Sequence, residues 1–481
     1  MVYHAWDLPD DNHVSPSTTP LESILATLDA LGEAAAAAVF RASDAAFGPW
    51  TVAVLLGTGL FLTVRLRWVQ IRHLPDALRS LRPVEAGGDG ALTPFQAFMT
   101  ALAASVGTGN IAGVATAIVS GGPGALFWIW CYGFFATAIK FTEAVLGVRY
   151  RVLGTAYLSA GPMHYLRDGL GLRRLGWVYA LIAGIAALTT TTFAQPNSIA
   201  VVFESHFHVP TVVTGVGVAV LAWLVIIGGV RSIGRAAERL SPLMVALYLL
   251  GGLLVIVTHA DRLSDVLALV FREAFSFRAG VGSAAGIGIM MAMRYGLARG
   301  IYANEAGYGT AAVAYGTARS RRPVQQGYAA VMEVFIVSFV TSSISALAIL
   351  MTGVWRSGLT STAAVAEAFN HAVPSVGGWV VAVCAFLFGY TTLLGWGYYG
   401  EQFLEYVLGR RVVKPYRWIY CGLIVIGATT HVDLVWAWGD LMNALQILPN
   451  LVGLVGLSGV AAALLREEEE RPRGGEEALD R

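Results

Sequence analysis

The sequence predicts an all-α integral membrane protein of about eleven transmembrane helices, and three observations support this. Hydrophobic residues make up 56% of the 481-residue chain and charged residues only 13%, against roughly 25% charged in an ordinary soluble domain. The mean hydropathy is +0.63. Apolar runs reach the roughly 20 residues that a bilayer core demands, so the pattern disfavours a water-soluble globule.

Eleven apolar runs, bounded by charges and prolines, supply the predicted helices. Two of them, 280–318 and 375–408, exceed one span, so part of each is expected to extend beyond the bilayer or to lie along its surface. The runs cover residues 49–66, 95–119, 122–147, 176–200, 210–230, 241–258, 280–318, 327–353, 375–408, 416–431 and 435–465.

Lys and Arg residues in the short loops predict the orientation, because cytoplasmic loops are enriched in them. If the first helix runs from outside to inside, the cytoplasmic loops carry twenty such residues and the other side carries five. We therefore expect a multi-pass protein of the cell membrane, with the N terminus outside and the C terminus in the cytoplasm. The basic loops are 65–82, 149–174, 231–239, 319–322 and 410–417.

The two ends of the chain lie outside this helical region. Residues 1–48 are expected to be an extracellular segment without a cleavable signal peptide, and the Ala-rich stretch 21–47 has the spacing of an interfacial helix. The tail 466–481, with four consecutive glutamates, is expected to be disordered in the cytoplasm. The net charge of +1 suggests no nucleic-acid partner. The three cysteines, far apart and inside apolar runs, suit packing rather than metal binding.

Two of the runs contain interruptions rich in Gly and Asn, at 105–110 and at 299–309. A helix in hydrocarbon must satisfy its own backbone, so such clusters at mid-depth need protein or a cavity around them. Close packing through small residues explains the glycines, but it hardly explains a buried Asn304–Glu305 pair. We expect both helices to unwind, so that freed N–H groups hold a carboxylate and freed carbonyls hold a cation.

The position of the interruptions predicts an internal repeat. Counting from 95–119, the interrupted helices are the first and sixth of the remaining ten. Five helices per repeat is an odd number, so a second repeat must insert upside down relative to the first. The expected units are a first five-helix repeat over 94–258 and a second over 280–465. The helix 49–66 is then an addition outside the repeats.

At these residues the sequence closely resembles the alanine/glycine:cation symporter family (sodium:alanine symporters), over about residues 49–460. The resemblance implies the leucine-transporter-type fold, with two inverted five-helix repeats whose first helices are discontinuous. Two departures, at Pro196 and at 308–315, leave the substrate preference open. The stretches that carry the resemblance are 94–98, 103–113, 121–130, 161–163, Gln195 with 197–200, Arg299-Gly300 with 304–307, and 391–396.

A transported amino acid presents a carboxylate and an ammonium group. The backbone N–H groups around Thr108, Gly109 and Asn110 are candidates for the carboxylate, helped by the Thr108 hydroxyl. The unwound carbonyls near residues 300–304 are candidates for the ammonium.

The resemblance implies three further substrate contacts. Gln195 and Asn304 should meet polar groups of the substrate, and Trp396 should form an apolar wall. Two alternatives stay open: Gln195 as a hydrogen-bonding residue between helices, and Trp396 as a residue of the interfacial belt.

Sodium prefers hard oxygen ligands, and the adjacent Thr391 and Thr392 match the position of a hydroxyl pair in leucine-transporter-type folds. The carbonyls of Ala103 and Val106, before the first break, would face them. The alternative is that both threonines bond to a carbonyl one turn earlier in their own helix. A second, less strongly indicated sodium site is expected near Asn110.

Other charges in the apolar runs need partners, because each is costly in hydrocarbon. Lys140 and Glu143 lie three apart on one helix face, which predicts an ion pair between them. Arg294, Arg299 and Glu305 share one helix region. Glu305 could pair with an arginine, cap a broken helix or take part in gating.

The sequence thus predicts a secondary active transporter, not an enzyme, in which Na⁺ is the coupling ion and carries alanine or glycine into the cell by alternating access. The nearest rival keeps the fold and couples to protons through Glu305. A membrane-embedded enzyme would need a nucleophile–base or metal motif, and no HExxH or GxSxG pattern appears in the chain. A channel should show a continuous polar stripe. The preferred amino acid, the stoichiometry and the oligomeric state are open.

Overall fold

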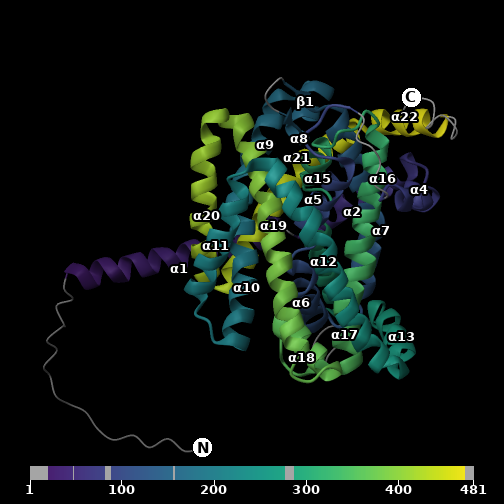
Figure 1. Ribbon diagram of the computed structural model, residues 1–481. Coiled ribbons are helices and arrows are strands. Elements are labelled where there is room, and N and C mark those ends of the chain that lie inside the picture. Colours follow the sequence, from purple (N-terminus) through teal and green to yellow (C-terminus); the bar gives the residue numbers. More distant parts are fainter. Residues whose placement is uncertain (1–19, 47, 82–87, 155–157, 277–286, 472–481) are drawn as a thin grey trace, which may run out of the picture.

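The computed structural model describes residues 20–46, 48–81, 88–154, 158–276 and 287–471, and nearly all of them are helical (Figure 1). The strands in these ranges are the antiparallel pair β1 (Val152–Leu153) and β2 (Leu158–Ser159). By length and composition, six described helices suffice to cross a membrane, or eight if each of two bent pairs is one span. The fold class is therefore confirmed, while the count of eleven spans stays a prediction.

From Pro94 to Thr258 the chain forms the helices expected for the first repeat. They are α5 (Pro94–Ser105), η1 (Thr108–Asn110), α6 (Ala112–Gly121), α7 (Ala125–Arg149), α8 (Pro162–His164), η2 (Tyr165–Gly169), α9 (Arg173–Ala186), η3 (Ala187–Thr191), α10 (Thr192–Phe207), α11 (Thr211–Ile226) and α12 (Gly229–Thr258).

The second half follows after η4 (Ala260–Arg262) and α13 (Leu263–Ala274). It consists of α14 (Ile287–Asn304), α15 (Thr310–Gly316), α16 (Pro323–Val334), η5 (Phe335–Thr341), α17 (Ser342–Thr352), η6 (Val354–Arg356), α18 (Ser361–Ala372), α19 (Gly377–Leu408), η7 (Arg410–Val412), α20 (Val413–Thr429), α21 (Val432–Gly456) and α22 (Ser458–Glu469).

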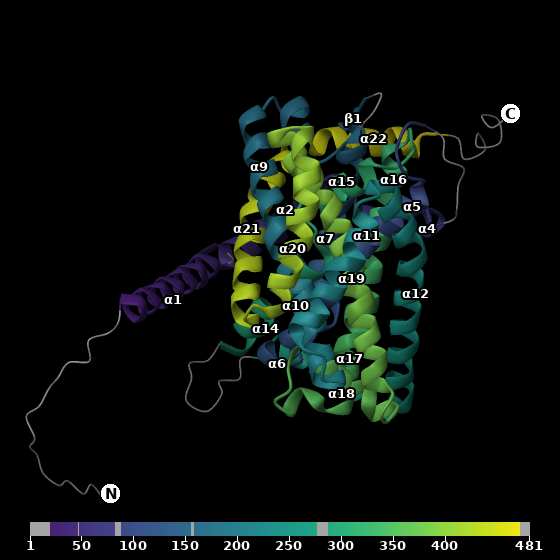
Figure 2. The same cartoon turned by 60° about the vertical axis from the view of Figure 1, so that its left-hand side comes forward.

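Before the first half stand α1 (Pro20–Ala46), α2 (Pro49–Arg65), α3 (Val69–Arg72) and α4 (Leu74–Arg79). α2 packs against α7 and α21, whereas α1 projects sideways from the bundle (Figure 2). Whether 1–48 is extracellular and α1 interfacial stays a prediction, and residues 1–19 lie outside the described ranges.

The first broken helix begins at a well-defined cap. The Thr93 hydroxyl accepts from the Gln96 backbone N–H at 3.1 Å, and the Gln96 side chain accepts from the Thr93 N–H at 3.2 Å. This capping box, with Pro94 in the first turn, fixes where α5 starts. α5 ends at Ser105, and the helical segment Thr108–Gly121 that follows is bent by 57° relative to it.

The second broken helix is interrupted over residues 305–309, between α14 and α15. Three of these residues have positive φ: Glu305 (56°), Gly307 (95°) and Gly309 (85°). Glycine adopts this region readily, but a side chain such as that of Glu305 raises the energy by about 1 kcal/mol or more. The interruption predicted at 299–309 therefore begins after Asn304, and the α14 helix continues through residues 299–304.

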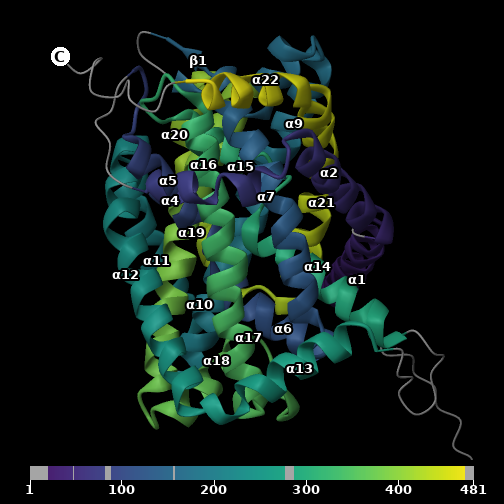
Figure 3. The same ribbon diagram turned by 90° about the vertical axis from the view of Figure 1, so that its right-hand side faces the viewer.

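The predicted run 435–465 is divided into α21 and α22, which bend by 55° at Leu457. α22 lies across the end of the bundle that carries the C terminus (Figure 3). The prediction of a disordered tail from residue 466 is wrong for Arg466–Glu469, which are helical because Glu468 and Glu469 pair with Arg322 and Arg72. Residues 472–481 lie outside the described ranges.

The long run 375–408 forms one helix, α19, of 32 residues. At 1.5 Å per residue it is about 48 Å long, longer than a bilayer core of about 30 Å, which agrees with the expectation that part of it extends further. Of the run 280–318, residues 280–286 are not described, and the remainder contains α14, the break over 305–309 and α15.

Candidate functional site

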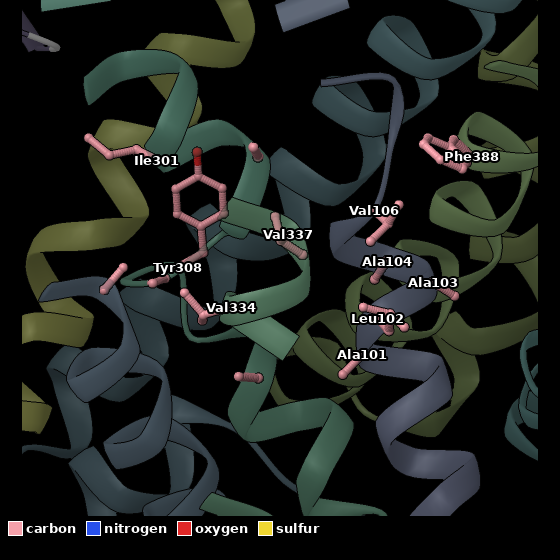
Figure 4. Close-up of a cluster of buried hydrophobic side chains, with 14 of the residues drawn as sticks. Ala101, Leu102, Ala103, Ala104, Val106, Ile301, Tyr308, Val334, Val337 and Phe388 are labelled. Atoms are coloured by element: carbon pink, nitrogen blue, oxygen red, sulfur yellow. The ribbon is translucent and has the colours of Figure 1, made fainter. Parts of the chain in front are cut away.

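The core of the bundle gathers around the two breaks (Figure 4). Ala103 and Val106 from the end of α5, Ile301 from α14, Val337 from η5 and Phe388 from α19 all belong to one buried apolar cluster. Polar groups inside this cluster must find partners, because unsatisfied groups are costly away from water. The hydrogen-bond partners of each buried polar side chain therefore indicate its role.

The first break leaves Gly107 with an extended backbone, next to η1. The Thr108 N–H and the Thr108 hydroxyl both donate to Gln195 Oε1, at 3.1 and 2.9 Å. A Cβ on Gly107 would lie 2.8 Å from the Thr392 hydroxyl, and one on Gly109 would lie 2.7 Å from the Tyr302 ring. The glycines thus let α10, α19 and α14 approach the break closely.

Asn110 is fully buried and faces away from the pocket between the breaks. Its Nδ2 donates to the Ser105 carbonyl at 3.0 Å. Its Oδ1 accepts from the hydroxyls of Thr341 and Ser342 at 3.3 and 3.4 Å. The oxygens of Asn110, Thr341 and Ser342 therefore lie together. Their two hydroxyls were not among the predicted site residues, although the polar stretch 341–345 within an apolar run could have indicated them.

The freed backbone groups of the second break are held by side chains from other helices. Glu143 Oε1 accepts from the N–H groups of Gly307 and Gly309 at 2.9 and 3.1 Å, and from the Asn450 amide at 2.7 Å. Asn304 Oδ1 accepts from the Ala306 N–H at 3.0 Å. Asn304 is thus a cap of its own broken helix and does not line the pocket.

The predicted ion pair between Lys140 and Glu143 is wrong. Lys140 donates to Glu333 on α16 at 2.5 Å and to the Asn304 carbonyl at 2.5 Å. Glu333 also accepts from the Ser105 hydroxyl at 2.6 Å and from the Tyr315 hydroxyl at 2.8 Å. The three-residue spacing showed that the two side chains share a helix face, but not which neighbouring helices that face meets.

The arginines of α14 do not pair with Glu305. Arg299 lies 3.6 Å from Asp440 on α21, over the ring of Trp436, and Arg294 lies 3.1 Å from Asp44. Glu305 instead accepts from the Trp396 indole N–H at 2.6 Å and from the Thr310 hydroxyl at 3.0 Å.

A narrow buried pocket lies between the two breaks, with room for the centre of about one water molecule (≈ 10 Å³). Of the predicted substrate residues, Gly109, Gln195 and Trp396 line it, whereas Thr108, Asn110 and Asn304 do not. Thr108 hydrogen-bonds to the lining residue Gln195. Its wall consists of Ala104, Ser105, Gly107, Gly109, Thr190, Thr191, Gln195, Tyr302, Glu305, Tyr308, Trp396 and Asn443.

The predicted sodium ligands are partly brought together. The Thr392 hydroxyl donates to the Ala103 carbonyl at 3.1 Å, across the interface of α19 and α5. The Thr391 hydroxyl bonds to the Leu387 carbonyl of its own helix at 2.8 Å, the alternative that the sequence had left open. Val106 is buried beside them. Of the predicted ligands, Thr392 and Ala103 are therefore in direct contact, whereas the Thr391 hydroxyl is engaged within its own helix.

Comparisons with known proteins match this arrangement. A model of the sodium:alanine symporter family matches residues 33–480. The sodium/alanine symporter AgcS of Methanococcus maripaludis is 38% identical over 428 residues, which are 87% of this chain and 93% of that protein. The probable sodium/glutamine symporter GlnT of Bacillus subtilis is 32% identical, over 91% of both chains.

Among solved structures, MhsT in complex with L-phenylalanine aligns with a TM-score of 0.58, over 79% of this chain and 99% of that one. The sequence identity is 12%, so this likeness concerns the fold.

Proposed function

The chain belongs to the sodium:alanine symporter family and has the leucine-transporter-type fold, and from this premise we propose that it carries small neutral amino acids, alanine or glycine, into the cell together with sodium. The two half-helix breaks form the binding centre. Alternating access to that centre moves the cargo, as is usual for repeats with discontinuous helices.

Three hydrogen bonds of the pocket residues Gln195 and Glu305 support the proposal most directly. Gln195 Oε1 accepts from both donors of Thr108, as a carboxylate oxygen would. Trp396 donates to the Glu305 carboxylate, as an ammonium group would. An α-amino acid has the acceptor and the donor that would replace these two partners.

We therefore place the substrate carboxylate at Thr108 and Gly109, and the ammonium at Glu305. The carbonyls near 300–304 suit the ammonium less well, because the Asn304 carbonyl accepts from Lys140 and the Ile301 carbonyl accepts from the Glu305 N–H. Asn110 and Asn304 then act as supports of the two breaks.

The walls argue for a small side chain. Tyr302, Tyr308 and Trp396 surround a pocket with room for the centre of about one water molecule. Even alanine therefore requires these side chains to move apart. A ring or a long chain would require a larger displacement of tightly packed groups, which raises the free energy steeply. Alanine and glycine need the smallest displacement.

For sodium we propose the carbonyls of Ala103 and Val106 with the hydroxyls of Thr391 and Thr392. Binding there exchanges the 3.1 Å bond between Thr392 and Ala103 for two bonds to the ion. A second sodium beside Asn110, Thr341 and Ser342 is consistent with the long contacts at Asn110.

The test is uptake of labelled alanine into proteoliposomes. We expect accumulation with an inward sodium gradient and none when potassium replaces sodium. Thr392→Val should raise the sodium concentration for half-maximal uptake by about tenfold, since one ligand of several is worth about 1.4 kcal/mol.

Thr258→Val is the matched control, because that hydroxyl bonds to Leu254, Val255 and His259 at the end of α12, none of which lines the pocket. Equal uptake of alanine in sodium and in potassium would contradict sodium as the coupling ion. Sodium-driven uptake of a large amino acid in preference to alanine would contradict the substrate class.

A proton-coupled mechanism is the second candidate, and one contact favours it. Glu305 is buried in the pocket, and within the described ranges its bonds go to Trp396 and Thr310 rather than to a basic side chain. Uptake driven by a pH gradient alone, and lost in Glu305→Gln, would establish this coupling in place of sodium.

A further inference from the structure

A second cavity, which shares no lining residue with the transport pocket, lies beside α9. α9 lies with β1 and α22 toward one end of the bundle (Figure 1). Its volume is ≈ 380 Å³, which is within the range of small-molecule sites. η2 and α9 contribute one side of it and α19 the other. The residues that line it are Arg167, Arg173, Arg174, Trp177 and Tyr406.

The cavity is strongly cationic. Arg173 and Arg174 are exposed, and within the described ranges neither guanidinium has an ion-pair or hydrogen-bond partner. Arg167 is held in place, because it pairs with Asp168 at 2.6 Å and its guanidinium lies 5.6 Å from the centre of the Tyr406 ring. Three positive charges therefore face one negative charge.

The adjacent histidine adds no charge near neutral pH. His164 hydrogen-bonds to Ser159 at 2.8 Å, and burial, followed by the nearby Arg167, lowers the pKa of His164 to about 4. The cationic character of the cavity thus comes from guanidinium groups, which stay protonated at every physiological pH.

Exposed apolar side chains stand next to the lining residues along the sequence of α9 and α19, and we call these side chains the rim of the cavity. Leu172, Trp177 and Val178 on one side are 41%, 45% and 40% exposed, and Leu408 on the other side is 62% exposed. In a multi-pass membrane protein this face meets the lipid near the headgroup region, where Trp is favoured. A soluble anion would use the arginines but not this rim.

We propose that the cavity binds the headgroup of an anionic phospholipid, with the phosphate between Arg173, Arg174 and Arg167 and the acyl chains along Trp177 and Leu408. Guanidinium groups bind phosphate oxygens in pairs. Basic pockets at the end of transmembrane helices are typical sites for such headgroups.

The lipid would hold together two helices that also line the transport pocket. α9 continues through η3, which contributes Thr190 and Thr191 to that pocket, and α19 contributes Trp396. We expect bound lipid to raise the thermal stability of the full chain without being needed for substrate recognition.

Native mass spectrometry of the purified full chain tests the proposal with three additives: phosphatidylglycerol, phosphatidylcholine and inorganic phosphate. We expect wild type to retain phosphatidylglycerol at least tenfold better than phosphatidylcholine. The double variant R173Q/R174Q should lose that preference, and its melting temperature should no longer rise with phosphatidylglycerol.

R235Q/R239Q is the matched control, because it removes two exposed arginines of α12 that do not line the cavity. Equal retention of both lipids by wild type, or an undiminished preference in R173Q/R174Q, would overturn the site. If inorganic phosphate displaces phosphatidylglycerol at millimolar concentration, the cavity is a site for a free anion, and the proposal of a phospholipid site is wrong.

Discussion

Gly107 touches the substrate and sodium regions at once, because its Cα faces both Thr392 and Gln195. Gly107→Ala places a methyl group 2.8 Å from the Thr392 hydroxyl and 3.2 Å from Gln195 Nε2. The hydroxyl must then leave the Ala103 carbonyl. We expect sodium-dependent alanine uptake to fall at least tenfold in proteoliposomes while the protein still inserts in the membrane.

Gly57→Ala on α2 is the control for that experiment, since an added Cβ there meets nothing within 4 Å. Normal uptake by Gly107→Ala would show that the close approach at the first break is not needed.

Glu305 carries the only charge proposed to meet the substrate. Glu305→Gln keeps the shape and an acceptor for Trp396, but loses the negative charge that pairs with an ammonium group. A hydrogen bond to a charged group contributes about 1.5–3 kcal/mol, so we expect alanine affinity to fall by about ten- to a hundredfold.

The comparison of alanine with propionate in a thermal-shift assay sharpens this prediction. In Glu305→Gln, alanine should raise the melting temperature less than it does in wild type. Propionate lacks the ammonium group, so its effect on the melting temperature should be unchanged. Equal weakening of both ligands would place Glu305 elsewhere in the mechanism.

At the scale of elements, one ion pair joins three of the four half-helices. Glu333 holds Ser105 of α5 and Tyr315 of α15, and its partner Lys140 holds the last carbonyl of α14. Breaking a buried pair by removing one member costs about 3–5 kcal/mol, whereas replacing both by apolar groups is often neutral. Variants of this pair can therefore distinguish its contribution to stability from its contribution to transport.

Lys140→Met should lower the melting temperature of the solubilised protein strongly, because it leaves Glu333 unpaired. The double variant K140M/E333L should recover most of that stability and still transport little, since Ser105 and Asn304 lose their partners. Transport near wild type by the double variant would reduce the pair to a packing role.

The sequence predicted the elements better than their contacts. The breaks could be found because close packing explains the glycines but not the Asn and Glu residues beside them in an apolar helix. Thr392 contacts Ala103, which the resemblance had placed opposite it. Tyr302, Tyr308 and Asn443 were missed because single aromatic and amide residues look like any other helix position. The π-helical turns η3 and η5, which place Thr190 and Thr341 at the breaks, have no sequence signature that we recognised.

At the scale of the whole molecule, three of the five basic loops lie toward one end. α4 and β1 lie within two of these loops and α16 follows a third, and all three helices or strands lie toward the end that carries α22, while α13 and α18 lie at the other end (Figure 1). We propose that the former end is cytoplasmic, because such loops are retained there.

Cysteine labelling tests this orientation. In a background with Cys131, Cys384 and Cys421 replaced by Ala, a membrane-impermeant maleimide added to intact cells should label Ser357→Cys and not Glu470→Cys. Inverted vesicles should show the reverse. The same pattern in both preparations would contradict a single orientation.

The hydrogen bonds from Thr108 to Gln195 and from Trp396 to Glu305 also bear on the return half of the cycle. A carrier that has delivered its cargo must reorient with its binding groups satisfied, or it can only swap one amino acid for another. Because Thr108 and Glu305, the groups proposed to bind the substrate carboxylate and ammonium, have partners within the protein, the carrier can reorient without substrate. Trp396→Phe, which lacks the indole N–H, should therefore slow net accumulation of alanine more than exchange of labelled for unlabelled alanine, and equal slowing of both would contradict this.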